Sequence, residues 1–218
     1  MMTELVSLDR HLMVLLNFDG GKWIDTFWYT FSDGRIWFPL FAVCLFMLWK
    51  TCQGTVRHKI LFIIIFSLIL VAADQLSSGV IKPLVGRLRP SHDPAIDNML
   101  HYVNDYHGGL HGFVSGHATN TVAITTWLWL IFKDKRTRIC MVIFALFTCY
   151  SRIYLGVHYP GDIICGAILG FMLAYFTFKF TGKYFTIGTQ KRPDLILIVL
   201  FMTLLLITIY STLKTFIL

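Results

Sequence analysis

Six apolar runs divide this chain, and they constrain its fold more than any other feature of the sequence. The runs cover residues 36–49, 60–80, 118–132, 139–150, 163–178 and 195–213. A helix needs about 20 apolar residues to cross a bilayer, so the runs are typical of membrane helices, although the first, at 14 residues, is short. Hydrophobic residues make up 56% of the 218 residues and charged residues only 14%, unlike an ordinary soluble domain. The sequence predicts an all-α, polytopic membrane helix bundle of about six transmembrane helices, in one domain over residues 1–218.

The segment before the first run predicts two interfacial elements. Residues 4–17 place leucines at helical spacing, which predicts an amphipathic N-terminal helix lying in the membrane interface. Residues 22–31 are rich in Trp, Phe and Tyr and fit an aromatic belt at the membrane–water boundary. Asp33, Gly34 and Arg35 follow, and they are expected to limit any backward extension of the first run.

Basic residues concentrate in one set of connectors. The connectors 50–59, 133–138 and 179–194 hold eleven Lys and Arg residues, and short basic connectors lie on the cytoplasmic side. The connectors 82–117 and 151–162 then face the other side, which predicts a multi-pass protein of the bacterial inner membrane with these two in the periplasm. Orientation and contact with the lipid bilayer explain the formal charge of +7. No nucleic-acid partner is expected, and no obligate protein partner is inferred.

Three polar clusters lie in or beside the two periplasmic connectors. They run from Lys82 to Pro90, from Ser115 to His117, and from Ser151 to Asp162. Alternating crossings place all three at one membrane face, where they can form one site.

The first group of these residues suits a phosphate. Lys82, Arg89 and Arg152 supply three cations, and arginine grips phosphate oxygens with two parallel hydrogen bonds. Ser115 and Gly116 stand where the third run begins, and the free backbone N–H groups of a helix start attract anions. Each of these residues alone is explained as well by a snorkelling base or a helix cap.

Two histidines and an acid complete the set. A nucleophilic histidine needs a lone pair on one ring nitrogen and a partner on the other, and Asp162 stands four residues after His158. His117 is the candidate proton donor to the leaving oxygen, because its ordinary pKa is near neutral. Pro160 and Gly161 favour a tight turn between His158 and Asp162.

In motif form the clusters read K-x6-R-P, S-G-H and S-R-x5-H-x3-D, over residues 82–162. In this order they resemble the type 2 phosphatidic acid phosphatase superfamily, in its branch of bacterial membrane lipid phosphatases. Val114 stands where that family often has proline, at a position that shapes the backbone and does no chemistry.

The resemblance implies a function and a mechanism. His158 attacks phosphorus and forms a phosphohistidine, Asp162 orients His158, and His117 protonates the leaving group and later activates water. The residues that bind the phosphoryl oxygens are Lys82, Arg89, Ser115, Gly116 and Arg152. No metal and no other cofactor is required. The substrate is a phosphorylated membrane lipid: lipid A at its 4′-phosphate is favoured, with undecaprenyl diphosphate and phosphatidylglycerol phosphate as alternatives.

Two other classes of protein, a haloperoxidase and a non-enzymatic membrane protein, are alternatives to a lipid phosphatase. A haloperoxidase that holds vanadate would use the same site, but those relatives are soluble. A transporter or lipid-binding protein would be favoured by charge inside the membrane, for which Asp74 is the main candidate, although its segment is expected to end a helix. Phosphate release from a phospholipid separates an enzyme from both. His101, His107 and His111 are interpreted as interfacial histidines, and the five cysteines as small hydrophobic residues without a zinc site.

Overall fold

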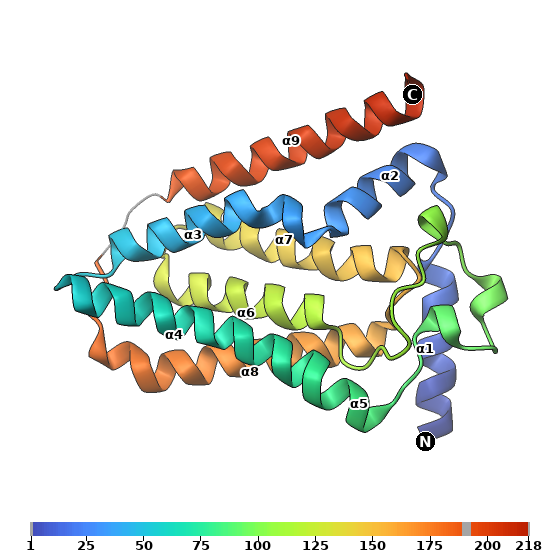
Figure 1. Ribbon diagram of the computed structural model, residues 1–218, viewed down its shortest axis with the longest axis horizontal. Helices are drawn as coiled ribbons and strands as arrows, with labels where there is room; N and C mark the ends of the chain where they lie inside the picture. The colour runs from blue at the N-terminus through green and yellow to red at the C-terminus, as the bar shows by residue number, and fades with distance from the viewer. Residues whose placement is uncertain (1, 189–192, 218) are drawn as a thin grey trace.

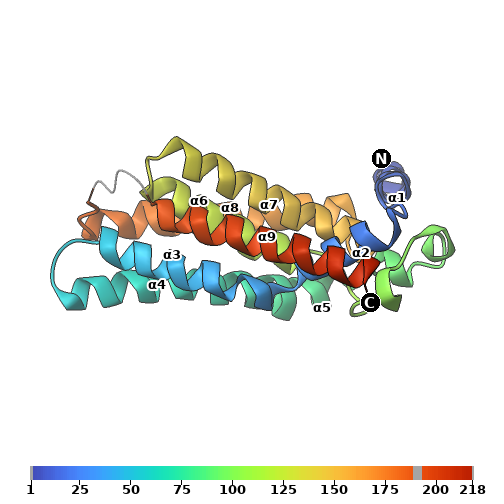
Figure 2. The ribbon, with the colours of Figure 1, turned by 90° about the horizontal axis from the view of Figure 1, so that it is seen from above.

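The computed structural model describes residues 2–188 and 193–217, and this part of the chain is almost entirely helical (Figure 1). Its α-helices are α1 (Met2–Leu16), α2 (Gly21–Ser32), α3 (Phe38–Thr51), α4 (Val56–Asp74), α5 (Lys82–Val85), α6 (Gly116–Ile131), α7 (Lys135–Tyr154), α8 (Pro160–Thr181) and α9 (Asp194–Phe216). A π-helical segment, Gln75–Ile81, joins α4 to α5, and short 3-10 turns lie in the connectors. The long helices run along one axis in two perpendicular views (Figures 1 and 2). The predicted all-α membrane bundle is confirmed.

Five helical segments in the described residues are long and apolar enough to cross a membrane. They are Gly34–Thr51, Val56–Val85, Lys135–Tyr154, Pro160–Tyr184 and Asp194–Phe216. The sixth apolar run forms α6, which has only 16 residues. Helix α6 lies between α7, α4 and α8 and contacts all three, so most of its surface packs against protein (Figure 1). Its small and hydroxyl-bearing residues Ala118, Thr119, Thr121 and Ala123 are buried accordingly.

The aromatic segment 22–31, for which the sequence predicts an interfacial belt, is helical. It forms α2, which a 3-10 turn at Gly34–Trp37 joins to α3 as one broken helical path. The side chain of Asp33 accepts a hydrogen bond from the Arg35 N–H and so caps the new turn. Phe31 is buried and stacks edge-on against Trp37 at 4.9 Å between ring centroids. Most of these rings are buried or half-buried, because α2 lies against α7 and α9, whereas Tyr29 stays exposed.

The second apolar run is longer than its sequence indicated. Helix α4, the π-helical segment and α5 are continuous from Val56 to Val85, a span of 30 residues. Asp74 is the last residue of α4, as expected of a helix end, but the helical path continues beyond it into the π-helical segment. The widened π-helical turn carries the chain on to Lys82, at the end where the other polar clusters lie.

The N-terminal helix α1 lies crosswise at that same end of the bundle (Figure 1). Leu5, Leu8 and Leu15 on α1 are exposed, whereas Met13 is fully buried against the bundle. A helix with one apolar outer face, lying across the helix axes, suits a position in the membrane interface. This agrees with the amphipathic helix predicted from residues 4–17.

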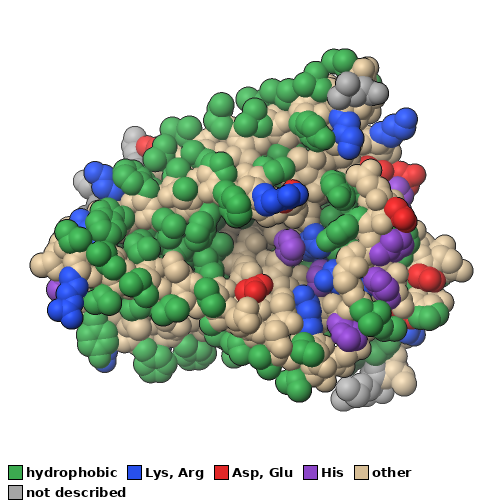
Figure 3. Space-filling model, viewed as in Figure 1, with side chains coloured by type: hydrophobic (Ala, Val, Ile, Leu, Met, Phe, Trp, Pro, Cys, Tyr) green, Lys and Arg blue, Asp and Glu red, His purple; other side chains and the backbone are tan. Residues whose placement is uncertain are grey.

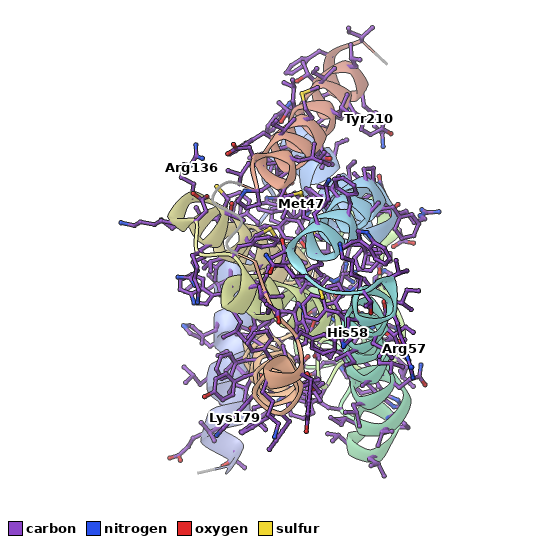
Figure 4. The ribbon with its side chains drawn as sticks, turned by 90° about the vertical axis from the view of Figure 1, so that its left-hand side faces the viewer. Met47, Arg57, His58, Arg136, Lys179 and Tyr210 are labelled. Carbon is purple, nitrogen blue, oxygen red and sulfur yellow. The ribbon has the colours of Figure 1, made fainter. Side chains whose placement is uncertain are left out.

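The opposite end of the bundle carries the basic connectors. Figure 4 looks onto this end and shows Arg57, Arg136 and Lys179 pointing outward from three different helices. Lys191 and Arg192, which were counted in the same basic set, lie outside the described residues. The chain therefore separates a basic end from an end that gathers the polar clusters at 82–90, 115–117 and 151–162.

Helices α6 and α8 make the most extensive contact in the bundle, and glycine permits it. A Cβ atom on Gly170 would lie 2.1 Å from the Thr119 carbonyl oxygen, and one on Gly166 would lie 2.6 Å from the Ser115 carbonyl oxygen. The backbones thus approach as closely as they do in small-residue membrane interfaces. Ser115 is the N-cap of α6, so this contact also fixes where along α8 the start of α6 lies.

We expect Gly170→Ala to destabilise the protein. In an exposed helix, replacing glycine with alanine stabilises by about 0.5–1 kcal/mol, but here the new methyl meets backbone, and overpacking of this kind costs about 1–3 kcal/mol or more. The measurement is the thermal midpoint of the detergent-solubilised protein. Gly109→Ala is the matched control, because a Cβ there meets nothing within 4 Å. A Gly170→Ala midpoint equal to or above that of the wild type would contradict this close approach.

Candidate active site

A tight reversal between α7 and α8 presents His158. Gly156 has a φ of 74°, a left-handed conformation that glycine adopts without strain, and Val157 donates a backbone hydrogen bond to the Arg152 carbonyl at 3.2 Å. Helix α8 then begins at Pro160, so Asp162 stands in its first turn. The reversal therefore lies before His158, and the turn predicted between His158 and Asp162 is wrong, because Pro160 and Gly161 begin α8.

His158 and Asp162 face each other in a buried setting. His158 Nδ1 lies 3.5 Å from Asp162 Oδ2, and both side chains are essentially without solvent exposure. That distance is longer than a normal hydrogen bond, and within the described residues Nδ1 has no hydrogen-bond partner. The pKa of His158 lies well below its usual value because the ring is buried and because Arg89, Arg152 and Lys82 are near. A neutral imidazole with a free lone pair is the form that a nucleophile requires.

Three cations approach this histidine. Arg152, only 3% exposed, donates to the Ser32 hydroxyl and to the Tyr106 hydroxyl, and Arg89 donates through Nε to the His111 carbonyl at 3.1 Å. Lys82 donates to the Ser78 hydroxyl at 3.3 Å.

The two guanidinium groups keep unused donors. Arg89 Nη1 and Arg152 Nε are buried and have no partner anywhere in residues 2–188 and 193–217. A buried, charged N–H without an acceptor is costly, so such donors indicate a place for an anion.

The start of α6 adds backbone donors. Ser115 is fully buried and caps the helix, while its backbone N–H donates to the Asp162 carbonyl at 3.0 Å. The N–H groups of the first helical turn have no intrahelical acceptor. A Cβ on Gly116 would lie 3.9 Å from Lys82 Nζ, so the α6 start lies beside that cation. Helix start and lysine together form an anion cradle.

One cavity of about 530 Å³ joins these groups to the apolar interior. Its polar end is formed by Lys82, Arg89, Gly116, His117, Arg152 and His158. Its apolar part is formed by Phe31, Trp37, Phe38, Phe41, Leu70, Ile124 and Phe144. Figure 3 shows this face hollowed near its middle, with basic, acidic and histidine side chains around the hollow. His117, Asn120, Thr121 and Ile124 follow one face of α6, so this face leads from His117 at the polar end to Ile124 in the apolar part.

The candidate residues from the sequence are therefore gathered in one place. The cavity wall includes Lys82, Arg89, Gly116, His117, Arg152 and His158. Ser115 and Asp162 lie directly behind the wall, Ser115 as the cap of α6 and Asp162 beside His158.

Two histidines of the connector 82–117, His101 and His107, are not among the residues that line this cavity. His107 pairs with Asp105, and His101 pairs with Asp25 at 2.9 Å. Within the described residues, Asp19, Asp25 and His101 are the group whose ligand atoms are close enough to hold a metal ion. The Asp25 carboxylate already accepts from the Tyr154 hydroxyl and faces His101, so these contacts account for the cluster without an ion.

Sequence reasoning left several residues of the site without a role. Arg87 bonds Asp162 directly, with 2.9 Å between Nη1 and Oδ1, and Ser32 and Tyr106 hold Arg152. Leu88 forms an isolated bridge with His111, so the chain is extended there. Residues two apart in an extended segment share a side, and the spacing of Arg87 and Arg89 was therefore the available signal for Arg87. Ser32 and Tyr106 come from distant segments, and no spacing in the sequence connects them to Arg152.

Comparison with known proteins adds an independent observation. The sequence profile of the PAP2 superfamily matches residues 59–186. The chain is 34% identical over 171 residues to a lipid A 4′-phosphatase of Bacteroides thetaiotaomicron, covering 78% of this chain and 75% of the relative. It is 32% identical over 178 residues to a lipid A 4′-phosphatase of Porphyromonas gingivalis, covering 82% and 75%.

Among solved structures, the fold is similar to the crystal structure of a transmembrane PAP2-type phosphatidylglycerolphosphate phosphatase from Bacillus subtilis. The TM-score is 0.64 at 20% identity, covering 83% of this chain and 87% of that one. The family profile spans more than half of the chain, and the two lipid A phosphatases align over most of it. The resemblance drawn from three short motifs is therefore confirmed, and the chain belongs to the PAP2 superfamily.

Proposed function

We propose that this protein is a membrane lipid phosphatase that removes the 4′-phosphate of lipid A through a phosphohistidine on His158. The observation that carries the proposal is the pair of buried guanidinium groups, each with an unpartnered N–H, around a buried neutral histidine at the polar end of one cavity. The relatives named as lipid A 4′-phosphatases support the choice of lipid.

The proposed reaction proceeds in two displacements at phosphorus. A ring nitrogen of His158 attacks, the bond from phosphorus to the lipid oxygen breaks, and His117 gives that oxygen a proton. His117 then takes a proton from water, which attacks the phosphohistidine and releases inorganic phosphate and neutral His158. Asp162 stabilises the imidazolium that forms in between.

The placement of each group supports these roles. His117 lies at the polar end, on the face of α6 that leads to the apolar part of the cavity, which suits a donor to the oxygen that links phosphate to lipid. Lys82, Arg89 and Arg152, with the α6 start, surround the phosphoryl oxygens and offset the charge that develops in the transition state. Because these cations already balance the phosphate, we propose that no metal ion takes part.

The cavity also offers acceptors beside the phosphate site, and these favour a sugar headgroup. Asn120 Oδ1 is buried and has no hydrogen-bond partner in the described part of the chain, and Asp74 places a carboxylate in the same wall. Lipid A is an acylated glucosamine disaccharide, whose hydroxyl and amide groups donate hydrogen bonds. The chain next to the diphosphate of undecaprenyl diphosphate is hydrocarbon, which has no such donors. Asn120 Oδ1 would therefore gain a donor from lipid A and stay unpaired with the polyprenyl lipid, while Asp74, which already accepts from the Gln75 side-chain amide, would gain a further donor from lipid A alone.

The proposed location is a bacterial inner membrane with the active site facing the periplasm. The basic connectors lie at the end of the bundle away from the site (Figure 4). Since basic connectors stay in the cytoplasm, the site end faces outward. Lipid A presents its phosphates on that side after export, so substrate and site meet there.

The direct test of the function is phosphate release by the purified protein. We expect turnover of lipid A bearing a 4′-phosphate to exceed that of undecaprenyl diphosphate and of phosphatidylglycerol phosphate. His158→Ala is the matched control and should lower the rate by on the order of 10³-fold or more, because water cannot replace the nucleophile. Equal rates for His158→Ala and wild type would reject the mechanism. Faster turnover of undecaprenyl diphosphate would reject the choice of lipid.

The sidedness is tested by thiol labelling in intact cells, in a variant whose five native cysteines are replaced. We expect an impermeant maleimide to label Gly109→Cys before lysis and Lys133→Cys only after lysis. Both positions are exposed, and they lie at opposite ends of the bundle. The reverse labelling pattern would place the active site in the cytoplasm and contradict the proposed location.

A further inference from the structure

A chain of ion pairs leads from the catalytic acid out to the N-terminal helix. Asp162 Oδ1 accepts from Arg87 Nη1 at 2.9 Å, and Arg87 Nη2 donates to Asp9 Oδ2 of α1 at 2.7 Å. The side chain of Asp162 is completely buried, and those of Asp9 and Arg87 are 13% and 24% exposed. Figure 1 shows α1 lying across the end of the bundle at which α8 begins.

The other contacts of these residues fix the arrangement further. Arg87 lies over the Tyr159 ring, with its guanidinium carbon 4.0 Å from the ring centroid. Asp9 Oδ1 accepts from the Gly161 N–H at 2.8 Å, and a Cβ on Gly161 would lie 2.7 Å from Asp9 Oδ2. Asp9 thus contacts both Arg87 and the first turn of α8. Its contact with α8 is at Gly161, where a side chain would collide with the Asp9 carboxylate.

We infer that Arg87, held in place by Asp9, is a positioning residue that aims the Asp162 carboxylate at His158. The inference rests on the proposed phosphatase function. Asp162 reaches His158 only through Oδ2, which also accepts from the Tyr159 N–H at 3.1 Å, while Arg87 occupies Oδ1. With Arg87 fixed from behind, the carboxylate cannot rotate away from the histidine.

The charges along this chain of ion pairs alternate in sign, and this alternation supports catalysis. When His158 attacks, it becomes positive. The charged groups from the site outward are then the His158 imidazolium, the Asp162 carboxylate, the Arg87 guanidinium and the Asp9 carboxylate. Asp9 offsets the positive charge of Arg87, so Asp162 keeps its negative field at His158 when the imidazolium forms. Helix α1, which carries exposed leucines, thereby also helps to position the catalytic acid.

A second ion pair from α1 provides a matched control. Arg10 donates to both oxygens of Asp93, at 2.8 and 3.1 Å, and Asp93 accepts from the Tyr159 hydroxyl at 2.6 Å. This pair also joins α1 to the site end, but it does not contact Asp162. Breaking it removes a docking contact of similar kind and leaves the aim of Asp162 unchanged.

The test compares Arg87→Gln, Asp9→Asn, Arg87→Lys and Arg10→Gln, with para-nitrophenyl phosphate as a generic phosphate monoester. We expect Arg87→Gln to lower kcat by about 10- to 100-fold with KM changed by less than about three-fold, as for other residues that orient a catalytic group. Asp9→Asn should lower kcat in the same direction, and the double variant should be no worse than Arg87→Gln alone, because the two act as a unit. Arg87→Lys should recover part of kcat, whereas Arg10→Gln should keep kcat within about two-fold.

Several results would overturn the inference. An unchanged kcat in Arg87→Gln, or equal losses in Arg10→Gln and Arg87→Gln, would leave only a docking role for α1. Turnover of para-nitrophenyl phosphate with none of any lipid phosphate would instead reject the proposed lipid substrate while the comparison of variants still stands. A wild-type protein inactive on every phosphate ester would reject the phosphatase function and this inference together.

Discussion

The cost of burying positive charge at the end of an apolar bundle is the constraint on which the site depends. Arg89 and Arg152 are held by neutral partners: a carbonyl for Arg89, and the hydroxyls of Ser32 and Tyr106 for Arg152. None of these neutralises a cation, and one N–H of each guanidinium has no partner within the described residues. The pKa of Arg89 is lowered by burial and by its neighbour Arg152, in line with the same penalty. An anion with several oxygens removes that penalty, so the empty site is organised for phosphate before any substrate arrives.

The fold supplies this arrangement from four separate segments. The π-helical extension of α4 delivers Lys82, the α7–α8 reversal delivers Arg152 and His158, and the close contact of α6 with α8 sets Ser115 against the Asp162 backbone. The broken α2–α3 path contributes Ser32 from its bend, against Arg152. The same elements enclose a cavity whose apolar part continues into the bundle, so a lipid-borne phosphate and its hydrocarbon are accommodated together.

Much of this could be predicted from the sequence, because membrane helices and phosphate motifs leave local signals. The apolar runs gave the helices, and K-x6-R-P, S-G-H and S-R-x5-H-x3-D gave the residues that the structure gathers. Features that depend on tertiary contact had no such signal. The burial of most aromatic rings in residues 22–31 follows from neighbours α7 and α9, and the helical path continues beyond Asp74 because a π-helical segment follows α4. The pairing of Arg87 with Asp9 joins residues 78 positions apart, which no local spacing reveals.

The central claim is that His158 carries the phosphoryl group covalently and without a metal ion. The most direct measurement uses His117→Ala with ³²P-labelled para-nitrophenyl phosphate in the presence of EDTA, followed by an alkaline quench and peptide mapping. The good leaving group needs no proton, while loss of His117 slows attack by water, so the intermediate should accumulate. The account predicts an alkali-stable, acid-labile label on the peptide that contains His158, and none in the His117→Ala, His158→Ala double variant. Label on another residue, or label that appears only when Mg²⁺ replaces EDTA, would contradict it.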